Sequence, residues 1–501
     1  MNGVSTKLAD SLRALKAIQD SDQVAIKTEQ LSRDDRERLS KHGFIKQVLR
    51  GWYISSDPSE REGDSTSWYT SFWRFCSEYL DSRLDEQWCL SPEQSLSIHV
   101  GDRTVPVQLL VRSPNGRNKP TNLLFDTSVF DIKQTLPVPE HMTSIDGVRV
   151  LTLSAALINC SKKAFEQHPV NVKAALSSIS DASDLLAILI AEGRTTIAGR
   201  LAGAFRNIGR DSIADAILNG MAAADYKVKE QDPFQAKDIV FARRDLSPYA
   251  NRMKIMWAQM REQVIANYPG QPSLTTSVES YLASVDEVFV TDAYHSLSIE
   301  GYKVSPELIE LVSSGNWDPD DTTTKAHTNA MAAKGYWNAF QKVKASIEQV
   351  LNGKNSGEEL ERIHGAWYLA LFEPSVAAGL LTATDLAGYR TGPVYIKGSK
   401  HVPPSRDAIR DMMPTLFDLL IEEESPAVRA ILGHFMFVYI HPYFDGNGRM
   451  GRFIMNLMFA SGGHPWHVVP VERREEYMQA LEVASVSGDI VPFTEFIESI
   501  R

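Results

Sequence analysis

The sequence predicts a mainly α-helical protein with a mixed α+β middle part. Its 501 residues are enough for two to four domains, each with a core of its own. From about residue 243 to residue 501 the apolar residues recur at helical spacing, whereas residues 68–234 mix helical periodicity with alternating, strand-like runs. We therefore expect three domains, at residues 1–58, 66–240 and 243–501.

Composition narrows the class of protein. A hydrophobic content of 43% with 23% charged residues is ordinary for a folded globular chain. No run approaches the ~18 apolar residues of a membrane helix, so we expect no membrane partner. The three cysteines are odd in number and lack metal-ligand spacing, which favours reduced thiols and a cytoplasmic location. The net charge of −11 argues against nonspecific nucleic-acid binding by the whole chain, although a local basic patch remains compatible with it.

The N-terminal residues predict two helices followed by a hairpin. Leu8, Leu12, Leu15 and Ile18 mark the first helix, Ser32 is placed to cap the second, and residues 44–54 form two short strands around a basic turn. This order resembles the winged helix-turn-helix head of AbiEi-type antitoxins. The resemblance implies binding of duplex DNA through Ser32, Arg33, Arg36, Lys41, Lys46 and Arg50. Interspersed acidic residues leave protein contact as an open alternative.

The middle domain carries no chemical signature. Helical patterning at 68–80 gives way to strand-like runs at 96–100, 107–111 and 148–151, and from residue 155 the pattern is helical again. The segment resembles the body of the same antitoxin-like proteins. We find no nucleophile, metal or phosphate motif in it and expect a structural or interaction domain.

The run from His441 to Arg452 concentrates the chemistry of the chain. An apolar helix over residues 430–440 ends at Pro442, and a second periodic segment begins near Arg449, so the run predicts a helix, a tight loop and a helix N-terminus. Free backbone N–H groups at a helix N-terminus attract anions. Two glycines within the loop would let the backbone approach a phosphate closely.

These residues resemble the Fic family motif HPFx[D/E]GNGRxxR, with Tyr443 in place of Phe. The resemblance implies an all-α domain that transfers AMP from ATP, with Mg²⁺, to a target hydroxyl. Carried over to this sequence, His441 is the general base and Asp445 holds the metal. The nucleotide would be bound by Gly446, Asn447, Gly448, Arg449 and Arg452.

Two further segments extend the resemblance. Residues 392–404 predict a hairpin with its turn at Gly398, which corresponds to the target-binding flap of Fic proteins and implies target contacts by Val394, Tyr395, Ile396, His401 and Val402. A surface hairpin without a partner is the alternative. Tyr477 corresponds to a residue that would stack on adenine, or else it is an ordinary core tyrosine.

A third segment resembles an inhibitory motif of the family, [S/T]xxxE[G/N], through Ser296, Glu300 and Gly301. A glutamate at a helix C-terminus is disfavoured by the helix dipole and favours a nearby cation. The resemblance names Arg452 as that cation, which implies that Glu300 withholds a γ-phosphate ligand. A solvated glutamate at a helix end is the alternative.

Two functions of different classes follow. The first is an autoinhibited adenylyltransferase that modifies Ser, Thr or Tyr hydroxyls of a target protein or of itself and releases pyrophosphate. Removal of AMP by the same site stays open. The second is a DNA-binding transcriptional regulator whose Fic half senses nucleotide or modifies itself. A homodimer is compatible with both.

Overall fold

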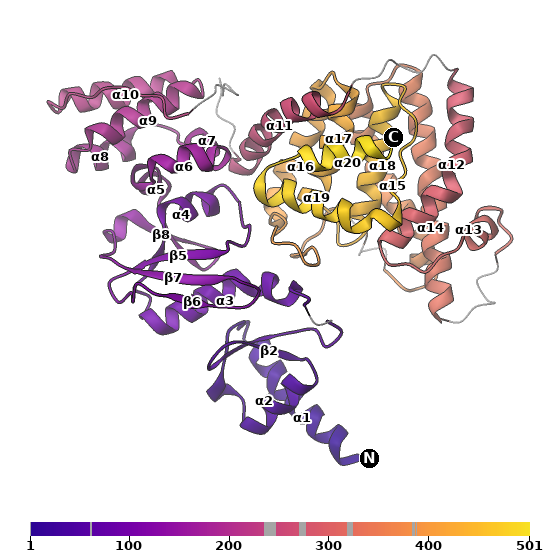
Figure 1. Cartoon of the computed structure of the whole chain (residues 1–501), viewed down its shortest axis with the longest axis horizontal. Helices are drawn as coiled ribbons and strands as arrows, with labels where there is room; N and C mark the ends of the chain where they lie inside the picture. Colours follow the sequence, from indigo (N-terminus) through magenta and orange to yellow (C-terminus); the bar gives the residue numbers. More distant parts are fainter. Residues whose placement is uncertain are drawn as a thin grey trace. The chain divides into compact units, whose positions relative to one another are not determined.

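The computed structural model of the protein describes residues 2–60, 63–234, 247–269, 277–317, 324–382, 386 and 388–501. The chain divides into two compact units (Figure 1). The N-terminal unit comprises Met1–Arg252 together with Tyr395–Val402, and the C-terminal unit comprises Met253–Val394 together with Pro403–Arg501. A short segment from late in the sequence therefore belongs to the N-terminal unit. The predicted boundary between residues 240 and 243 lies outside the described residues.

The first 55 residues form two helices and a three-stranded antiparallel sheet of order β1-β3-β2. Ser32 caps α2, because its hydroxyl oxygen accepts the backbone N–H of Asp35 at 3.1 Å. Gly43, at φ 74°, follows the helix end. Both predicted helices and the hairpin are confirmed as elements. The bounds are α1 (Asn2–Asp20), β1 (Ile26–Lys27), the 3₁₀ helix η1 (Thr28–Gln30), α2 (Arg33–Lys41), β2 (Ile45–Leu49) and β3 (Trp52–Ser55).

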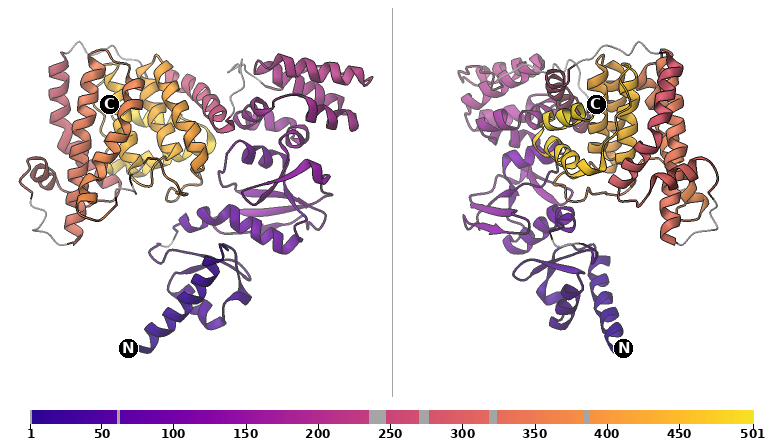
Figure 2. Two further views of the ribbon diagram at one scale, coloured as in Figure 1. Left: turned by 180° about the vertical axis from the view of Figure 1, so that it is seen from behind. Right: turned by 45° about the vertical axis from the view of Figure 1, so that its right-hand side comes forward.

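A four-stranded sheet of order β4-β5-β7-β6 forms the centre of the middle part, and β5 and β7 pair in parallel. Aromatic residues of α3 pack against it, with Trp68 edge-on to Phe72 and Phe75 within one buried cluster. Figure 2 shows this helix beside the sheet. The elements are α3 (Thr66–Leu84), β4 (Cys89–Leu90), α4 (Pro92–His99), β5 (Gln108–Ser113), β6 (Pro120–Asn122), β7 (Ser128–Lys133), the 3₁₀ helix η2 (Pro139–His141), β8 (Met142–Ile145) and β9 (Val148–Leu151).

The predicted strand at 96–100 was wrong, because this segment is the end of helix α4. Ser91 caps that helix and Pro92 occupies its first turn, which are strong local signals for a helix start. Leu96, Ile98 and Val100 are all buried although residues two apart point to different sides of a helix, so the segment is enclosed on more than one side and its alternation did not identify a strand. The strands predicted at 107–111 and 148–151 are confirmed as β5 and β9.

Six helices complete the N-terminal unit before residue 234. They are α5 (Leu153–Asn159), α6 (Lys162–Gln167), α7 (Pro169–Ser178), α8 (Ser183–Ala191), α9 (Thr195–Asn207) and α10 (Asp211–Ala223). Gly199 and Gly203 of α9 lie against the backbone carbonyls of Lys229 and Gln231, where a Cβ atom would come within 2.3 Å of an oxygen. These glycines therefore allow a segment of chain to pack closely against α9.

The C-terminal unit is helical, and no strand occurs among its described residues. Helices α17 and α18 are almost entirely buried and pack on each other, and α18 also contacts α14 and α15 (Figure 2). The bounds are α11 (Pro248–Asn267), whose first residues count with the N-terminal unit, α12 (Val278–Ile299), α13 (Pro306–Ser313), α14 (Thr324–Leu351), α15 (Ser356–Ala377), α16 (Arg406–Glu422), α17 (Pro426–Ile440), α18 (Asn447–Ala460), the 3₁₀ helix η5 (Val471–Arg473), α19 (Arg474–Ser487) and α20 (Val491–Ser499).

Three searches of the described residues bear on the class of protein. No single helix there is both long and apolar enough to cross a membrane. The bent pair α7 and α8 together has sufficient length and apolar composition, which is the only property that it shares with a membrane span. No group of three or more His, Cys, Asp or Glu side chains is arranged to hold a metal ion in that part of the chain. The cysteines Cys76, Cys89 and Cys160 are free and buried.

Candidate active site

The loop between α17 and α18 is fixed by its own side chains. Helix α17 ends at Ile440, and His441 adopts a left-handed backbone at φ 52°. The side chain of Asn447 accepts the N–H of Tyr443 at 3.0 Å and donates to its carbonyl at 2.8 Å. The Tyr443 ring stacks on Tyr368 with centroids 3.7 Å apart, so this aromatic side chain packs the loop against α15. The loop therefore holds one conformation against the core.

His441 is suited to act as a base. Its Nδ1 lies 3.2 Å from the carbonyl of Val438, and because a carbonyl only accepts, Nδ1 carries the proton. Burial lowers the pKa of His441 to about 4, against an opposing contribution from that hydrogen bond. At neutral pH the imidazole is therefore uncharged, and Nε2 keeps its lone pair.

The first turn of α18 forms an anion-binding position. The helix begins at Asn447, and the residue before it, the N-cap Gly446 (φ 81°), has no side chain that could cap the helix. The first backbone N–H groups of a helix have no partner within the helix and carry a partial positive charge. A Cβ atom at Gly448 would lie 2.4 Å from Oε1 of Glu300 and 3.2 Å from Nη1 of Arg452. A carboxylate thus already lies against this turn, in the position that suits another anion.

The predicted pairing of Glu300 with Arg452 is confirmed. Nη2 of Arg452 donates to Oε1 of Glu300 at 2.8 Å. Nε donates to the Ser296 hydroxyl at 2.8 Å and Nη2 also to the Ser296 carbonyl at 3.1 Å, so both polar residues of the motif contact the same guanidinium. Burial would raise the pKa of Glu300, but the charges of Arg452, Arg449 and Arg474 outweigh it and hold the pKa below its usual value.

Helix α12 places Glu300 at its C-terminal end. Ile299 is the last helical residue, Glu300 caps it, and Gly301 follows at φ 90°, a conformation that suits glycine. Nε of Arg474, from the start of α19, donates to the Ile299 carbonyl at 2.8 Å. The sequence gives no sign of this role of Arg474, because the residue is 175 positions from the carbonyl that it caps.

Arg449 and Asp445 form a second pair. Nη2 of Arg449 lies 3.2 Å from Oδ2 of Asp445, and the guanidinium also lies between the rings of Tyr302 and Phe372, with centroids 5.4 and 5.0 Å away. Asp445 is 61% exposed while Arg449 is 1% exposed. One exposed carboxylate beside a helix N-terminus fits Mg²⁺, which commonly takes one or two protein carboxylates and completes its shell with substrate phosphates and water.

Tyr477 lies in the core, which corrects the prediction of an adenine-stacking residue. Only 2% of the residue is exposed, and its hydroxyl lies 2.9 Å from Nε2 of His434. Its ring also packs against Phe493 and Phe496. A ring enclosed in this way offers no free face to a base, so the alternative of an ordinary core tyrosine holds.

The predicted flap has its turn but no paired strands. Gly398 adopts φ 74°, and the Ser399 N–H donates to the Ile396 carbonyl at 3.1 Å. No strand is assigned in residues 392–404, so the expected β-ladder is absent there. The flap residues Tyr395, Ile396, His401 and Val402 belong to the N-terminal unit, while Val394 belongs to the C-terminal unit.

The tip of this segment is bound within the N-terminal unit. Nζ of Lys397 lies 2.9 Å from Asp64, and the Gly398 N–H donates to Oγ1 of Thr66 at 3.3 Å. The Lys400 carbonyl accepts the Val105 N–H at 2.9 Å, and Val402 packs on the same apolar cluster as α3. The backbone of the predicted target-binding segment therefore already engages another part of the chain.

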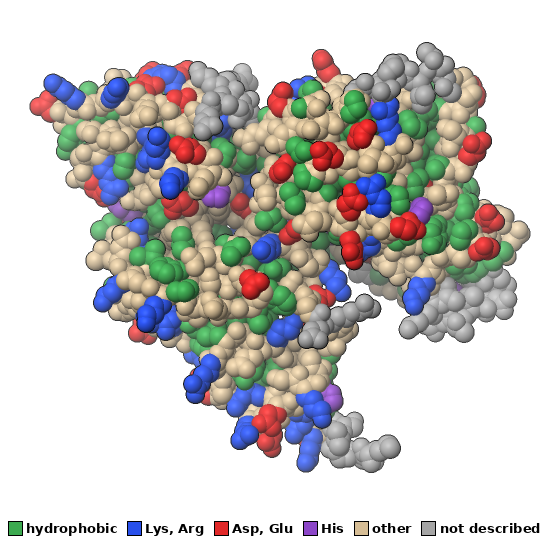
Figure 3. Space-filling model, viewed as in Figure 1, with side chains coloured by type: hydrophobic (Ala, Val, Ile, Leu, Met, Phe, Trp, Pro, Cys, Tyr) green, Lys and Arg blue, Asp and Glu red, His purple; other side chains and the backbone are tan. Residues whose placement is uncertain are grey.

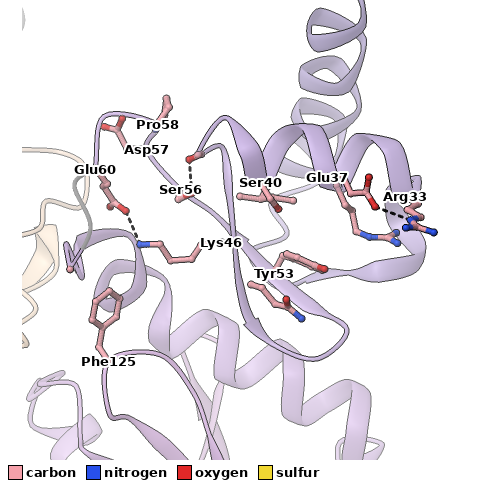
Figure 4. Close-up of a pocket in the computed structure, with 15 residues that line it drawn as sticks. Arg33, Glu37, Ser40, Lys46, Tyr53, Ser56, Asp57, Pro58, Glu60 and Phe125 are labelled. Carbon is pink, nitrogen blue, oxygen red and sulfur yellow. Dashed lines mark hydrogen bonds and ion pairs between the residues drawn. The ribbon is translucent and has the colours of Figure 1, made fainter.

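Most residues that were predicted to contact DNA form hydrogen bonds or ion pairs within the protein. Arg36 donates to the carbonyls of Thr28 and Leu31, and Lys46 bonds Glu60 at 3.1 Å and lies over the Phe125 ring. Arg33 pairs with Glu37 at 2.8 Å, whereas Arg50 is exposed. Figure 4 shows Arg33, Glu37, Lys46, Glu60 and Phe125 among the residues that line an open pocket of about 740 Å³, which Arg50 does not line. Acidic side chains lie among the basic ones at this end of the chain in Figure 3, so the local basic surface is diluted.

Comparisons with known proteins agree with the site. A model described as the Fic/DOC family matches residues 356–459, from the start of α15 almost to the end of α18. The protein adenylyltransferase Fic of Drosophila willistoni is 29% identical over 220 residues, and that of Drosophila melanogaster is 28% identical over 220 residues. Each match covers 42% of this chain and 40% of the relative. The chain thus aligns with less than half the length of these curated relatives.

Solved structures of Fic proteins also match this chain. Fic-1 from C. elegans has a TM-score of 0.36 at 18% identity, with 68% of this chain and 94% of that chain covered. A Fic-domain signalling protein from Bacteroides thetaiotaomicron has a TM-score of 0.34 at 17% identity, covering 49% and 93%. These scores are low, so the assignment depends on the sequence match and on the geometry of the loop. The helices around His441 form a Fic domain.

The protonation state of His441 is the first testable prediction. In spectra of protein with isotope-labelled histidine, the His441 ring is expected to carry its proton on Nδ1 at pH 7 and to become charged only as the pH falls to about 4. The His441→Ala variant identifies the signal. A titration midpoint near 6.5 would contradict the burial argument.

The flap tip gives a second prediction. Lys397→Glu places a like charge against Asp64, whose side chain is 6% exposed, so amide hydrogen exchange over residues 395–402 should rise at least about twofold, since even exposed pairs are worth up to about 1 kcal/mol. Lys397→Met, which keeps the stem without the charge, should have a smaller effect, and salt should narrow the difference between them. Equal exchange in all three proteins would mean that this ion pair does not hold the tip.

Proposed function

We propose that the protein transfers AMP from ATP to a hydroxyl group of a protein and that Glu300 holds the enzyme inactive at rest. One observation carries this proposal: a neutral base, His441, belongs to the loop that leads directly into a helix N-terminus where a carboxylate is paired with the buried Arg452. The curated relatives that match α15 to α18 are adenylyltransferases, which supports the reaction.

The side chains suggest how the reaction would proceed. Nε2 of His441 takes the proton of the target hydroxyl, whose oxygen attacks the α-phosphorus of ATP. The bond from that phosphorus to the bridging oxygen of the β-phosphate breaks, and pyrophosphate leaves with the bonding electrons. The first-turn N–H groups of α18 and the guanidinium of Arg452 suit the β- and γ-phosphates. Asp445 would hold Mg²⁺, which supplies charge neutralisation when bound.

Inhibition follows from competition for one cation. The Glu300 carboxylate pairs with Arg452 at 2.8 Å and lies against Gly448, so a phosphate group at that position would meet a negative charge and lack its ligand. Without that ligand the α-phosphate is not aligned for attack, even if the nucleotide binds elsewhere in the site.

The third prediction tests reaction and inhibition together. With labelled ATP and Mg²⁺, Glu300→Ala should raise AMP incorporation at least about tenfold, because Arg452 becomes available to phosphate. The double variant Glu300→Ala with Arg452→Ala should lose that gain, which is the non-additivity expected of a coupled pair. Intact-mass analysis of the protein itself and of added candidate targets measures the transfer.

Matched variants separate the explanations. Glu287→Ala removes an exposed carboxylate from the same helix and should leave incorporation unchanged. His441→Ala in the Glu300→Ala background should abolish transfer while ATP binding persists. A Glu300→Ala protein no more active than wild type would refute the inhibitory role. Transfer that survives His441→Ala within about tenfold would refute the general base.

Direction, target and location belong to the same proposal. Removal of AMP, with Glu300 orienting a water, is the alternative for this site and predicts that AMP-modified protein loses its label only when Glu300 is present. The target is an unidentified protein or the chain itself. A cytoplasmic location is favoured by the three free thiols.

Binding of duplex DNA by the head is our fourth prediction, because Arg33 and Arg50 remain exposed. The full-length protein should bind duplex DNA from its own promoter region with affinity that falls steeply as salt rises. Arg50→Glu should weaken binding, whereas a change at the exposed Lys16 of α1 should not. Absence of binding at low salt would leave the head as a protein-contact module.

A further inference from the structure

Arg390 is a buried arginine to which the sequence analysis assigned no role. Only 3% of the residue is exposed. Its Nε donates to the carbonyl of His441 at 2.7 Å, Nη1 donates to the carbonyl of Gly392 at 2.9 Å, and Nη2 donates to the carbonyl of Pro404. Its own backbone N–H donates to the carbonyl of Pro442 at 2.8 Å. All of these residues belong to the C-terminal unit.

These acceptors join two separate parts of the site. Gly392 and Pro404 lie at the two ends of the flap segment, and His441 and Pro442 begin the catalytic loop. One guanidinium therefore bridges the two ends of the flap segment and attaches them to His441, the proposed general base. The planar guanidinium, with donors pointing in fixed directions, can bond three separate carbonyls, whereas a lysine ammonium presents one compact point.

The contact with His441 also stabilises an unusual backbone. His441 is the left-handed residue that ends α17, where the last carbonyl groups of the helix lack partners within the helix. A cation is favoured at that negative end of the helix dipole. Arg390 thus supplies a hydrogen bond and a charge where the chain turns from helix to loop.

We propose that Arg390 is a positioning residue that fixes the imidazole of His441 relative to Gly392 and Pro404, the two ends of the flap segment within the C-terminal unit. The inference depends on the proposed transfer reaction. Arg390 donates to backbone carbonyls of the flap ends and of the loop that begins at His441, so its role in the reaction would be to hold these segments in place. Its loss separates the flap from the base while the anion position on α18 stays intact.

The fifth prediction concerns Arg390→Lys, measured in the Glu300→Ala background. The turnover number for AMP transfer should fall about tenfold or more, because small misplacements of reacting groups are costly, while the dissociation constant for ATP stays within about twofold. Hydrogen exchange over residues 391–404 should rise. Arg429→Lys is the matched control, because Arg429 belongs to α17, the helix whose C-terminal end Arg390 contacts, and likewise donates to a carbonyl, that of Glu423.

A variant without the charge, Arg390→Gln, adds the pKa of His441 as a second measurement. A purely structural role of Arg390 would leave this pKa unchanged. Burial lowers the pKa of His441 most, Arg390 lowers it further, and Glu300 and Asp445 raise it. In the histidine spectra Arg390→Gln should therefore shift the His441 midpoint upward relative to Arg390→Lys. If Arg390→Gln fails to fold, Arg390→Lys alone decides through exchange and turnover.

The outcomes are distinguishable. Unchanged exchange over residues 391–404 in Arg390→Lys, or transfer within about twofold of its parent, overturns the positioning role. If the Glu300→Ala parent shows no transfer, the proposed function fails, while the exchange and histidine measurements still test whether Arg390 holds the flap to the loop. An effect of Arg429→Lys equal to that of Arg390→Lys would assign the loss to general destabilisation of α17.

Discussion

A buried guanidinium needs an anion, and Arg452 imposes that need on the whole site. The residue is 2% exposed within α18, so its charge is stabilised only by groups that the protein or a ligand supplies. Glu300 supplies the charge, and Ser296 accepts two further hydrogen bonds. Nη1 has no partner among the described residues and lies close to Gly448. The guanidinium thus keeps one donor directed at the helix N-terminus while Glu300 occupies the rest.

Two other arginines fix the ends of the helices that carry the functional residues. Arg474 donates to the last carbonyl of α12, next to Glu300, and Arg390 donates to the carbonyl of His441 at the end of α17. Helix C-termini leave carbonyls without partners and carry a partial negative charge, so a cation from elsewhere in the chain stabilises each end. His441 and Glu300 are therefore both placed by long-range contacts to backbone groups.

This explains which parts of the site the sequence could predict. Local chemistry predicted the Ser32 cap and the loop between α17 and α18, because those residues act on near neighbours. The pairing of Glu300 with Arg452, 152 positions apart, was implied by the family resemblance and not by local chemistry. Arg390 and Arg474 were not readable, because their acceptors are backbone carbonyls, which every residue has. The predictions for Tyr477 and for the segment 96–100 were wrong because of their surroundings. Tyr477 is buried and cannot stack on a base, and the Ser91 cap favours a helix at 96–100 in spite of the alternating pattern. The turn at Gly398 could be predicted because it depends on local sequence. The β-ladder expected around it is absent, because the segment forms hydrogen bonds with Thr66 and Val105 instead.

The two partners of the central ion pair differ in their freedom to move. Arg452 has a side-chain exposure of 3% and is part of the core helix α18, whereas the side chain of Glu300 is 28% exposed at the end of α12, followed by Gly301. Breaking the pair by moving Arg452 would disturb the core, but moving Glu300 requires only that the last turn of α12 yield. Under the proposed function a phosphate that takes Arg452 weakens Glu300 binding by the factor with which Glu300 weakens phosphate binding, because the coupling is reciprocal. Any signal that relieves inhibition therefore acts most directly at the end of α12, where the bond from Arg474 to the Ile299 carbonyl holds Glu300 in place.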